Sequence, residues 1–319
     1  MNRNKLYIVV PCYKEEAALP ETNRQLCGLL QQMIANGEVD GQSRIMYVDD
    51  GSPDATWALI ERYAAESPLV CGVKLAANRG HQHALLAGLH TAKDMADITI
   101  SIDADLQDDI EAIREMVAQY RRGYDIVYGV RRRRDTDTWF KRTSALAFYK
   151  LMHWLGVKSV YNHADFRLMS RRAVEQLCQY RERNLFLRGL VPLLGYSSTT
   201  VSYDRKERTA GESKYPLKKM IAFAADGITS FSTFPLHLLL RAGILFIFVS
   251  VAILAYVLYR YIIHDVVPGW ASIMISIWFV GGCMLVGLGI VGEYIGKIYI
   301  EVKDRPRFDV EKTTWEKDK

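Results

Sequence analysis

The chain has 319 residues, of which 50% are hydrophobic and 24% are charged, and this composition excludes an intrinsically disordered protein. Its 41 Lys and Arg residues exceed its 36 Asp and Glu residues, but a net charge of +5 is too small to indicate a nucleic-acid-binding protein. The five cysteines form no C-x-x-C pair, so the sequence favours a reducing compartment and predicts neither a disulfide framework nor a zinc site.

Short β-branched runs alternate with helical stretches in the N-terminal part of the chain. The predicted strands are 6–10, 45–48, 70–75, 98–102 and 126–128. The predicted helices between them are 15–35, 54–66, 81–93 and 109–122. This alternation predicts an α/β domain with a mostly parallel sheet, followed by a mixed helical and strand extension over 139–203.

Polar residues cluster where four of these strands end. The clusters are Pro11-Cys12-Tyr13, Asp49-Asp50-Gly51-Ser52, Asn78-Arg79-Gly80 and Asp103-Ala104-Asp105. Ligands of such sheets bind beyond the carboxyl ends of the strands. The sequence therefore predicts one binding site to which four strand ends contribute.

Asp103 and Asp105 stand at positions i and i+2 directly after an apolar strand. Two carboxylates at this spacing can point to the same side and bind one hard divalent cation, which a diphosphate leaving group needs. A solvated turn is the alternative for such a pair taken alone, and its position at a strand end favours the metal site. Gln107 continues the pattern and is either a further metal-site residue or an ordinary surface residue.

The turn Asp49-Asp50-Gly51-Ser52 has two interpretations. Gly51 permits a tight turn, and the preceding carboxylates can accept hydrogen bonds from a ribose or from a base N–H. Residues of these types are also common in helix caps.

Basic residues in two places are candidates for binding phosphate. Arg131 is the first of four consecutive arginines and lies nearest to a strand end, although such a run is often only solvated. The second cluster, which directly precedes a helical stretch, is Arg208, Gly211, Glu212, Ser213, Lys214 and Tyr215. Asp165, which opens an apolar run, is a candidate base or acceptor-positioning residue.

The C-terminal part contains two long uncharged runs, 242–259 and 266–292, each long enough to cross a hydrocarbon core of about 30 Å. The stretch 216–233 carries Lys218 and Lys219 beside apolar residues and is typical of a helix in the membrane interface. The turn over 262–269 contains no Lys or Arg, whereas both outer flanks are basic, which predicts both termini in the cytoplasm. Two buried helices of a large soluble protein are the alternative.

Taken in order, the motifs resemble those of the polyprenyl-phosphate glycosyltransferases of family 2, above all the bactoprenol glucosyltransferase branch, with relatives such as dolichyl-phosphate mannose synthase. The matching segments begin at Val10, Val48, Asn78, Asp103, Asp165, Gly211, Gly227 and Gly292. The resemblance covers nearly the whole chain. It implies a GT-A fold, in which a Rossmann-like domain binds the nucleotide sugar, with a C-terminal two-helix transmembrane hairpin.

The resemblance also implies a role for each matching residue. The nucleoside-binding residues would be Pro11, Tyr13, Glu15 and Asp50, with Asp103 on the nucleotide. The residues that hold Mg²⁺ or Mn²⁺ on the diphosphate would be Asp103, Asp105 and Gln107, and the phosphate-binding residues would be Arg131, Arg208, Ser213 and Lys214. Asp165 would lie near the sugar. One departure is Lys14, where the family usually has Asn.

The implied organisation is a cytoplasmic catalytic domain over 1–215, an interface helix over 216–234, two membrane helices over 235–298 and a cytoplasmic tail over 299–319. The implied reaction is the transfer of one sugar, with inversion, from a nucleoside diphosphate donor to a polyprenyl phosphate at the inner membrane. Glucose from UDP-glucose and undecaprenyl phosphate are the leading pair. The family's processive branch carries a Q-x-x-R-W motif, which this sequence lacks.

Other donors remain open, namely GDP-mannose, a UDP-aminosugar or a UDP-linked modified pentose. A non-catalytic membrane scaffold that binds nucleotide sugars is the alternative from another class, and both acidic residues of the metal pair argue against it. Small residues from Gly281 to Gly296 also make a homo-oligomer a possibility, because they permit close packing of helices.

Overall fold

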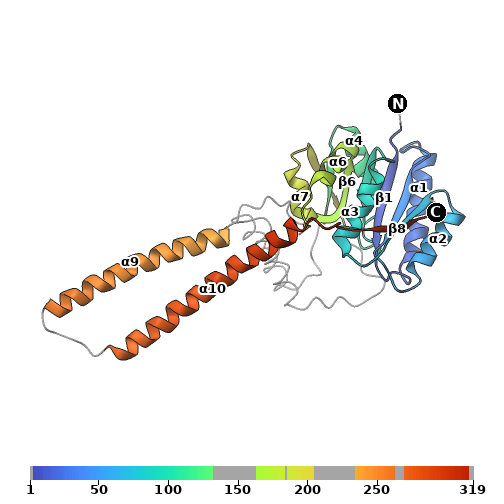
Figure 1. The fold of residues 1–319 in the computed structure, drawn as a ribbon. Helices are drawn as coiled ribbons and strands as arrows, with labels where there is room; N and C mark the ends of the chain where they lie inside the picture. The colour runs from blue at the N-terminus through green and yellow to red at the C-terminus, as the bar shows by residue number, and fades with distance from the viewer. Residues whose placement is uncertain (1–2, 132–162, 184, 205–233, 263–268, 316–319) are drawn as a thin grey trace. The chain divides into compact units, whose positions relative to one another are not determined.

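The computed structural model describes residues 3–131, 163–183, 185–204, 234–262 and 269–315 (Figure 1). These residues fall into two compact units. The first holds the N-terminal part of the chain together with the segment that starts at Arg305, and the second holds two long helices.

A single mixed sheet forms the centre of the first unit. Its strands are β1 (Leu6–Cys12), β2 (Arg44–Asp49), β3 (Val70–Leu75), β4 (Ile98–Ser101), β5 (Ile126–Arg131), β6 (His163–Ser170), β7 (Ser198–Tyr203) and β8 (Val310–Thr313). They are arranged in the order β7-β5-β6-β4-β1-β2-β3-β8. β6 runs antiparallel to β4 and β5, and β8 runs antiparallel to β3, while the other pairings are parallel.

Helices cover both faces of this sheet (Figure 1). In this unit they are α1 (Leu19–Ala35), α2 (Thr56–Glu66), α3 (His81–Ala92), α4 (Ala112–Arg121), α6 (Arg171–Gln179) and α7 (Leu187–Leu193). β1 is buried along its whole length, as expected for a central strand of a mostly parallel sheet.

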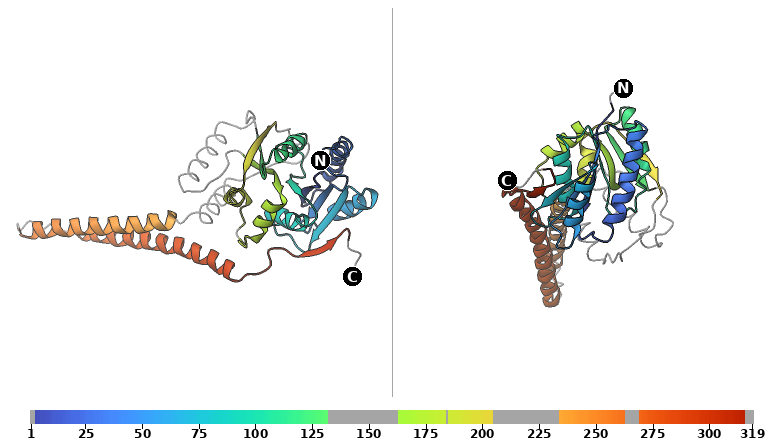
Figure 2. Two further views of the ribbon diagram at one scale, coloured as in Figure 1. Left: turned by 90° about the horizontal axis from the view of Figure 1, so that it is seen from above. Right: turned by 90° about the vertical axis from the view of Figure 1, so that its right-hand side faces the viewer.

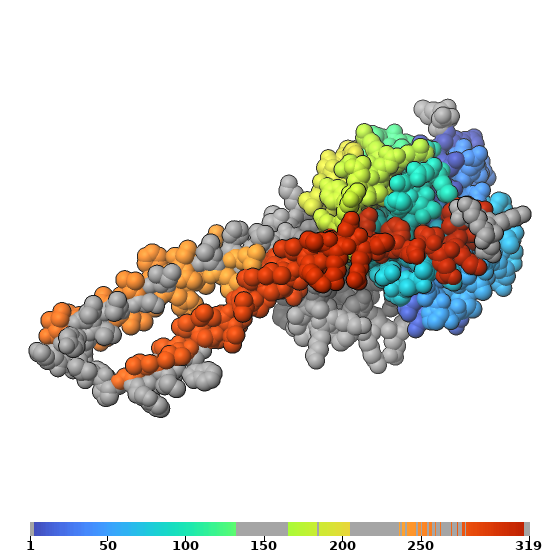
Figure 3. Space-filling view, in the orientation of Figure 1, coloured from blue at the N-terminus to red at the C-terminus, as the bar shows by residue number. Residues whose placement is uncertain are grey.

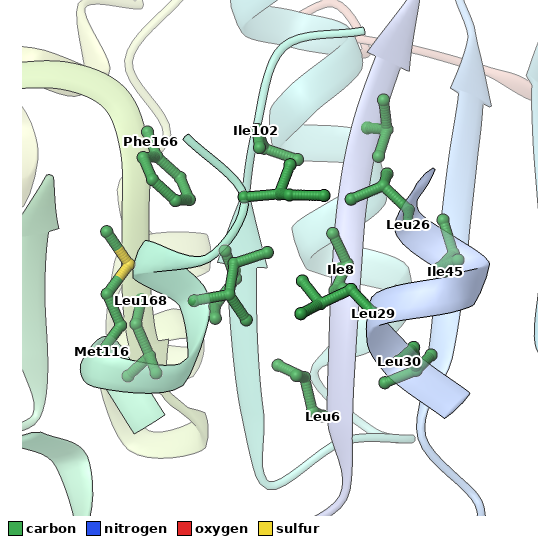
Figure 4. Packing of buried hydrophobic residues seen from close by; sticks show 14 of the residues in the cluster. Leu6, Ile8, Leu26, Leu29, Leu30, Ile45, Ile102, Met116, Phe166 and Leu168 are labelled. Atoms are coloured by element: carbon green, nitrogen blue, oxygen red, sulfur yellow. The ribbon is translucent and has the colours of Figure 1, made fainter. Parts of the chain in front are cut away.

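The main hydrophobic core lies between the sheet and helices α1 and α4 (Figure 4). Because side chains alternate along a strand, Ile8 of β1 and Ile45 of β2 face α1, where they meet Leu26 and Leu30. Farther along the sheet, Met116 of α4 packs near Leu168 of β6 (Figure 4). These contacts fix the strands whose ends carry the predicted site.

Helix α3 lies on the opposite face of β1 and β2. A Cβ atom added at Gly88 would come within 2.4 Å of Val9 and 2.6 Å of Val48, so only glycine permits this close approach. The beginning of α3, next to Gly80, is thereby held at the carboxyl ends of β1 and β2.

All five strands predicted in the N-terminal part are confirmed, as is the α/β class with a mostly parallel sheet. Boundaries shift by a few residues, since β4 ends at Ser101 and α4 begins at Ala112. The extension predicted over 139–203 contains β6, α6, α7 and β7 in its described part. The predicted interface helix over 216–233 lies outside the described residues.

The C-terminal strand β8 was not predicted, because its sequence, Val-Glu-Lys-Thr, is short and mostly polar. It pairs with β3 at the edge of the sheet, and the ladder continues on both sides of it. The Ala76 N–H donates to the Asp309 carbonyl at 3.0 Å, and the Thr314 N–H donates to the Gly72 carbonyl at 3.0 Å. β8 therefore covers an edge that would otherwise expose unpaired backbone groups.

The second unit consists of helices α9 (Phe234–Ile262) and α10 (Trp270–Val302), which run antiparallel to each other (Figure 2). An edge-to-face contact joins Phe246 of α9 and Phe279 of α10, with ring centroids 5.9 Å apart. Large apolar side chains of both helices are exposed. Figure 3 shows α10 in orange to red as a space-filling surface.

Among the described residues, one segment, Phe279–Val302, has the length and the mean hydropathy, 1.6, of a membrane-crossing helix, and none of it is buried. The apolar stretch of α9, Arg241–Ile253, is shorter than this segment of α10.

Candidate functional site

The predicted nucleoside-binding residues lie together at the carboxyl ends of the parallel strands. β4, β1 and β2 are neighbours and run parallel, so their carboxyl ends meet there. A pocket of about 210 Å³ opens at these strand ends. Its lining residues are Pro11, Cys12, Tyr13, Glu15, Asp50, Asn78, Gly80, His81 and Ala84. The four residues that the resemblance assigned to the nucleoside therefore line one pocket.

Asp50 joins the end of β2 to the loop that precedes α3. Its carboxylate accepts hydrogen bonds from the N–H groups of Arg79 at 2.7 Å and Gly80 at 2.8 Å. Burial raises the pKa of Asp50, and these two hydrogen bonds act in the opposite direction. Asp50 thus shapes the wall of the pocket.

Gly51 makes this junction possible. Its φ of +63° lies in the left-handed region, and a Cβ atom there would come within 2.8 Å of the Ala77 carbonyl carbon and of the Asn78 nitrogen. The tight turn predicted at Gly51 is therefore confirmed, and α2 begins only at Thr56. Hydrogen bonding of the carboxylates to a ribose or a base stays a prediction.

The backbone conformation at Lys14 explains why Asn suits this position in the family. Its φ of +57° is left-handed, a conformation that Asn adopts more easily than Lys does. The Lys14 N–H donates to the Ser52 hydroxyl at 3.0 Å, so the β1 and β2 loops support each other.

Asp103 provides the observation that fits a cation. One of its carboxylate oxygens, Oδ1, is buried and has no hydrogen-bond partner among the described residues, although His81 Nε2 lies 3.4 Å away. Burial raises the pKa of Asp103 to about 6, and the neighbouring carboxylates of Asp165, Asp108 and Asp105 add to this effect. An unsatisfied oxygen among several carboxylates is suited to a hard divalent cation.

Asp105 and Gln107 lie in the same turn. The Gln107 N–H donates to Asp105 Oδ1 at 3.2 Å, and Leu106 between them has a φ of +50°, which reverses the chain. Gln107 is only 6% exposed, so it is not an ordinary surface residue. In the described part of the chain no three His, Cys, Asp or Glu side chains form a complete metal site, and diphosphate oxygens would have to supply further ligands.

Arg131 lies at the end of β5, as the sequence predicted, and is paired. Its Nη2 lies 3.4 Å from Asp108 Oδ1, which also accepts a hydrogen bond of 2.6 Å from the Tyr203 hydroxyl. Asp108 and Tyr203 were not predicted from the sequence. Asp108 directly follows Gln107, but nothing in the sequence connects it to β7.

Asp165 reaches the site because β6 runs antiparallel to β4, which brings the start of β6 to the end of β4. The Asp165 carboxylate pairs with Arg167 at 2.8 Å and Arg188 at 3.0 Å, and His81 lies 3.8 Å away. Burial alone would raise the pKa of Asp165, but the guanidinium groups of Arg188 and Arg167 hold it well below its usual range. Asp165 was predicted from the sequence, and Arg188 was not.

The remaining predicted residues, Arg208, Ser213 and Lys214, lie outside the described residues. A larger hollow of about 950 Å³ lies at the other end of the strands, near the amino ends of β1, β4 and β5, around Asp125, Arg171 and Arg172. None of the predicted site residues lines it.

Similarity to known proteins agrees with this geometry. The family model for glycosyl transferase family 2 matches residues 7–178, which run from the second residue of β1 to beyond the end of β6. A glycosyltransferase of Bacillus subtilis that is itself uncharacterised, YkoT, is 53% identical over 306 residues, covering 96% of this chain and 91% of that protein. The SfII prophage-derived bactoprenol glucosyl transferase of Shigella flexneri is 40% identical over 314 residues, covering 97% and 98%.

Among solved structures, the mannosyltransferase PcManGT from Pyrobaculum calidifontis is 16% identical with a TM-score of 0.46, and it covers 96% of this chain and 89% of its own. That structure contains GDP-Man and Mn²⁺. The family assignment rests on the sequence relationships, which span most of the chain. On this basis the chain belongs to glycosyl transferase family 2, and it is a glycosyltransferase with the GT-A fold.

Proposed function

We propose that this glycosyltransferase transfers one sugar from a nucleoside diphosphate donor to a polyprenyl phosphate, with glucose from UDP-glucose and undecaprenyl phosphate as the leading pair. The observation that carries the proposal is 40% identity, over nearly the full length of both chains, to proteins named bactoprenol glucosyl transferase. The arrangement of the strand-end residues supports it.

In the proposed reaction, a phosphate oxygen of the lipid attacks the anomeric carbon of the sugar. The new carbon–oxygen bond forms as the bond to the diphosphate breaks, the nucleoside diphosphate leaves, and the anomeric configuration inverts. The pocket lined by Pro11, Tyr13, Glu15 and Asp50 holds the nucleoside. Asp103, Asp105 and Gln107 would hold Mg²⁺ or Mn²⁺, which would supply positive charge to stabilise the diphosphate leaving group.

This reaction does not need a strong base. A phosphate monoester has a second pKa of about 6, so the acceptor is largely an oxyanion nucleophile at neutral pH. Asp165 is paired with two guanidinium groups, which makes it a weak proton acceptor. The main tasks of the protein are therefore to position the two reactants and to neutralise their charge.

A lipid acceptor in a membrane favours an enzyme that is bound to that membrane. We propose that α9 and α10 both cross the inner membrane, that the catalytic domain and both termini are cytoplasmic, and that residues 216–234 lie in the interface. Support comes from the exposed apolar side chains of both helices and from the basic residues that flank them. Arg208, Ser213 and Lys214 would then act near the lipid phosphate.

The test is transfer of radiolabelled sugar from a panel of UDP- and GDP-sugars to undecaprenyl phosphate by the purified full-length protein. Reactions contain Mg²⁺ or Mn²⁺, with an EDTA control. Metal-dependent labelling of the lipid from one donor supports the proposal and identifies the sugar. Donor binding without labelled lipid from any donor contradicts it and favours a nucleotide-sugar-binding scaffold.

A further inference from the structure

The first turn of α7 is fixed at the candidate site from two sides. Arg167 of β6 donates from Nη1 to the Leu187 carbonyl at 3.3 Å. Gln82, in the first turn of α3, accepts a hydrogen bond of 2.8 Å from the Leu187 N–H through Oε1. Because both contacts involve Leu187, the next residue, Arg188, has a defined position relative to β6 and α3.

Arg188 donates hydrogen bonds from two nitrogen atoms to the Asp165 carboxylate. Its Nη2 lies 3.0 Å from Asp165 Oδ2, and its Nε lies 3.3 Å from Asp165 Oδ1. This fork geometry holds a guanidinium plane more rigidly than a single contact does. Asp165 is itself held by Arg167, whose Nη2 donates to Oδ1 at 2.8 Å.

The three side chains differ sharply in exposure. Those of Arg167 and Asp165 are only 2% and 8% exposed, whereas that of Arg188 is 34% exposed. Of this triad, Arg188 is therefore the member that a ligand in solution can reach. The buried residues Asp165 and Arg167 hold the Arg188 side chain in place.

Within the triad, two guanidinium groups share the Asp165 carboxylate. The triad adjoins the predicted metal pair, since His81 Nε2 lies 3.8 Å from Asp165 Oδ2 and 3.4 Å from Asp103 Oδ1. An exposed cation that is rigidly held beside the expected position of a diphosphate is suited to phosphate oxygens, which guanidinium groups bind in a fork geometry.

We propose that Arg188 binds a phosphate group of a reactant, and that Asp165 and Arg167 are positioning residues that hold it for this purpose. The inference rests on the proposed function, because that function supplies phosphate at this end of the strands. The phosphate belongs either to the lipid acceptor or to the donor diphosphate. This role makes Asp165 a residue that orients a cation.

A matched control lies at the other end of the strands, near the amino ends of β4 and β5. Arg172 of α6 forms a two-nitrogen pair with the buried carboxylate of Asp125, and no predicted site residue is near it. The Arg172 side chain is 64% exposed and that of Asp125 is 6% exposed. Arg172→Gln therefore breaks an Arg–Asp pair of the same kind away from the chemistry.

The experiment compares Arg188→Gln, Arg188→Lys and Arg172→Gln in the full-length protein. Steady-state transfer gives kcat and KM for each reactant, and thermal unfolding gives stability. Arg188→Gln should lose about 10- to 100-fold in kcat/KM, the range expected for loss of one charge-assisted hydrogen bond. Arg188→Lys should recover part of this loss because it restores the charge but not the fork. Arg172→Gln should keep wild-type kinetics.

Two arms identify the phosphate. If Arg188→Gln raises the KM of the lipid acceptor while UDP binds as tightly as to the wild type, the phosphate is that of the acceptor. If the variant weakens UDP binding in the absence of acceptor, it is that of the donor. Either result supports the proposal.

The proposal is overturned if Arg188→Gln matches Arg172→Gln in kcat, in both KM values and in UDP affinity. It is also overturned if activity falls only in step with thermal stability and Arg188→Lys behaves like Arg188→Gln. Asp165→Asn, which keeps one acceptor oxygen, should change the same KM as Arg188→Gln, because a positioning residue acts through its partner.

Failure of the proposed function gives a different result. In that case the wild-type protein labels no polyprenyl phosphate from any donor. Equilibrium binding of UDP and of a short-chain polyprenyl phosphate in detergent, to wild type and to Arg188→Gln, then tests Arg188 alone. Equal affinities for both probes would overturn the role of Arg188.

Discussion

The two acidic residues after β4 differ in their surroundings, and this difference leads to a prediction. Asp103 has a buried oxygen without a hydrogen-bond partner among the described residues, whereas Asp105 accepts the Gln107 N–H. Replacing Asp105 by Asn removes a charge but keeps an oxygen that can accept this hydrogen bond. Asp105→Asn should therefore fold normally and lose at least about 100-fold in metal-dependent transfer.

The measurements for Asp105→Asn are lipid labelling and thermal unfolding. The control is Asp94→Asn, an exposed position in the loop before β4, which should behave like the wild type. Near-normal transfer by Asp105→Asn would contradict the metal role of Asp105.

The turn at Gly51 leads to a second prediction. In Gly51→Ala, the new Cβ would meet the backbone of Ala77 and Asn78, which cannot move without disturbing the hydrogen bonds from the following loop to Asp50. Unfolding free energy should fall by about 1–3 kcal/mol, and UDP should bind more weakly. Denaturant unfolding and calorimetry measure the two effects.

Gly195→Ala separates the two costs of this substitution. Gly195 also has a left-handed φ, +73°, but no atom lies within 4 Å of its added Cβ. This variant should show only the cost of the backbone conformation, about 1 kcal/mol, with unchanged UDP binding. Equal UDP affinity in Gly51→Ala and the wild type would contradict the role given to the β2 turn.

At the level of residues, the sequence predicted those site members that follow a strand directly. Asp50, Asp103 and Asp105 could be identified because a strand end determines where they lie. Arg188 and Tyr203 could not, since each meets its partner only through the fold. Arg188 lies 23 residues from Asp165, and Tyr203 lies 95 residues from Asp108.

At the level of elements, strands rich in β-branched residues were predictable, and β8 was not. The pairing of Lys74 with Glu311 joins residues 237 apart in the chain, and a polar four-residue strand carries no periodic signal of its own. The pairing with β3, rather than hydrophobicity, makes this segment a strand.

Truncation after Asp304 provides a test of β8. The edge of β3 would lose its partner strand, so the catalytic domain should unfold at a lower temperature. The amides of Gly72 and Ala76, which donate to Thr314 and Asp309, should exchange hydrogen faster. Differential scanning calorimetry and hydrogen exchange measure these changes.

The control for this truncation is Glu311→Ala. It removes only the ion pair between Glu311 Oε2 and Lys74 Nζ, which are 3.0 Å apart, and leaves the backbone hydrogen bonds between β3 and β8 intact. Its effect on unfolding free energy should be within about 1 kcal/mol. Unchanged amide exchange after truncation would mean that β8 does not protect the edge of the sheet.

At the level of the whole molecule, both long C-terminal helices were predicted, but their ends were not. α10 runs to Val302, beyond the end of the uncharged run at Gly292. The added turns contain Glu293, Lys297 and Glu301, and they belong to the segment Phe279–Val302, whose length and mean hydropathy are those of a membrane-crossing helix. Hydropathy locates the apolar part of such a helix, whereas hydrogen bonding determines where the helix itself stops.

The proposed orientation can be tested with single cysteines on the two sides of the hairpin. The run 262–269 has no Lys or Arg, whereas Lys303, Arg305 and Arg307 follow α10, so the loop should face the outside and the C-terminus the cytoplasm. In intact spheroplasts, a membrane-impermeant maleimide should label Asp265→Cys. It should label Lys319→Cys only after lysis.

Wild-type protein, which keeps its five native cysteines, provides the background signal in both conditions. Labelling of both variants before lysis, or of Lys319→Cys alone, would contradict a hairpin with cytoplasmic ends. A single crossing by α10, with α9 in the cytoplasmic interface, would put position 265 in the cytoplasm and position 319 outside, so that Lys319→Cys alone would be labelled before lysis. If α9 crosses the membrane as proposed, a variant ending at residue 269 should stay in the membrane after carbonate treatment, because one inserted helix is enough to hold a protein there. Release of this variant by carbonate would mean that α9 lies only in the interface.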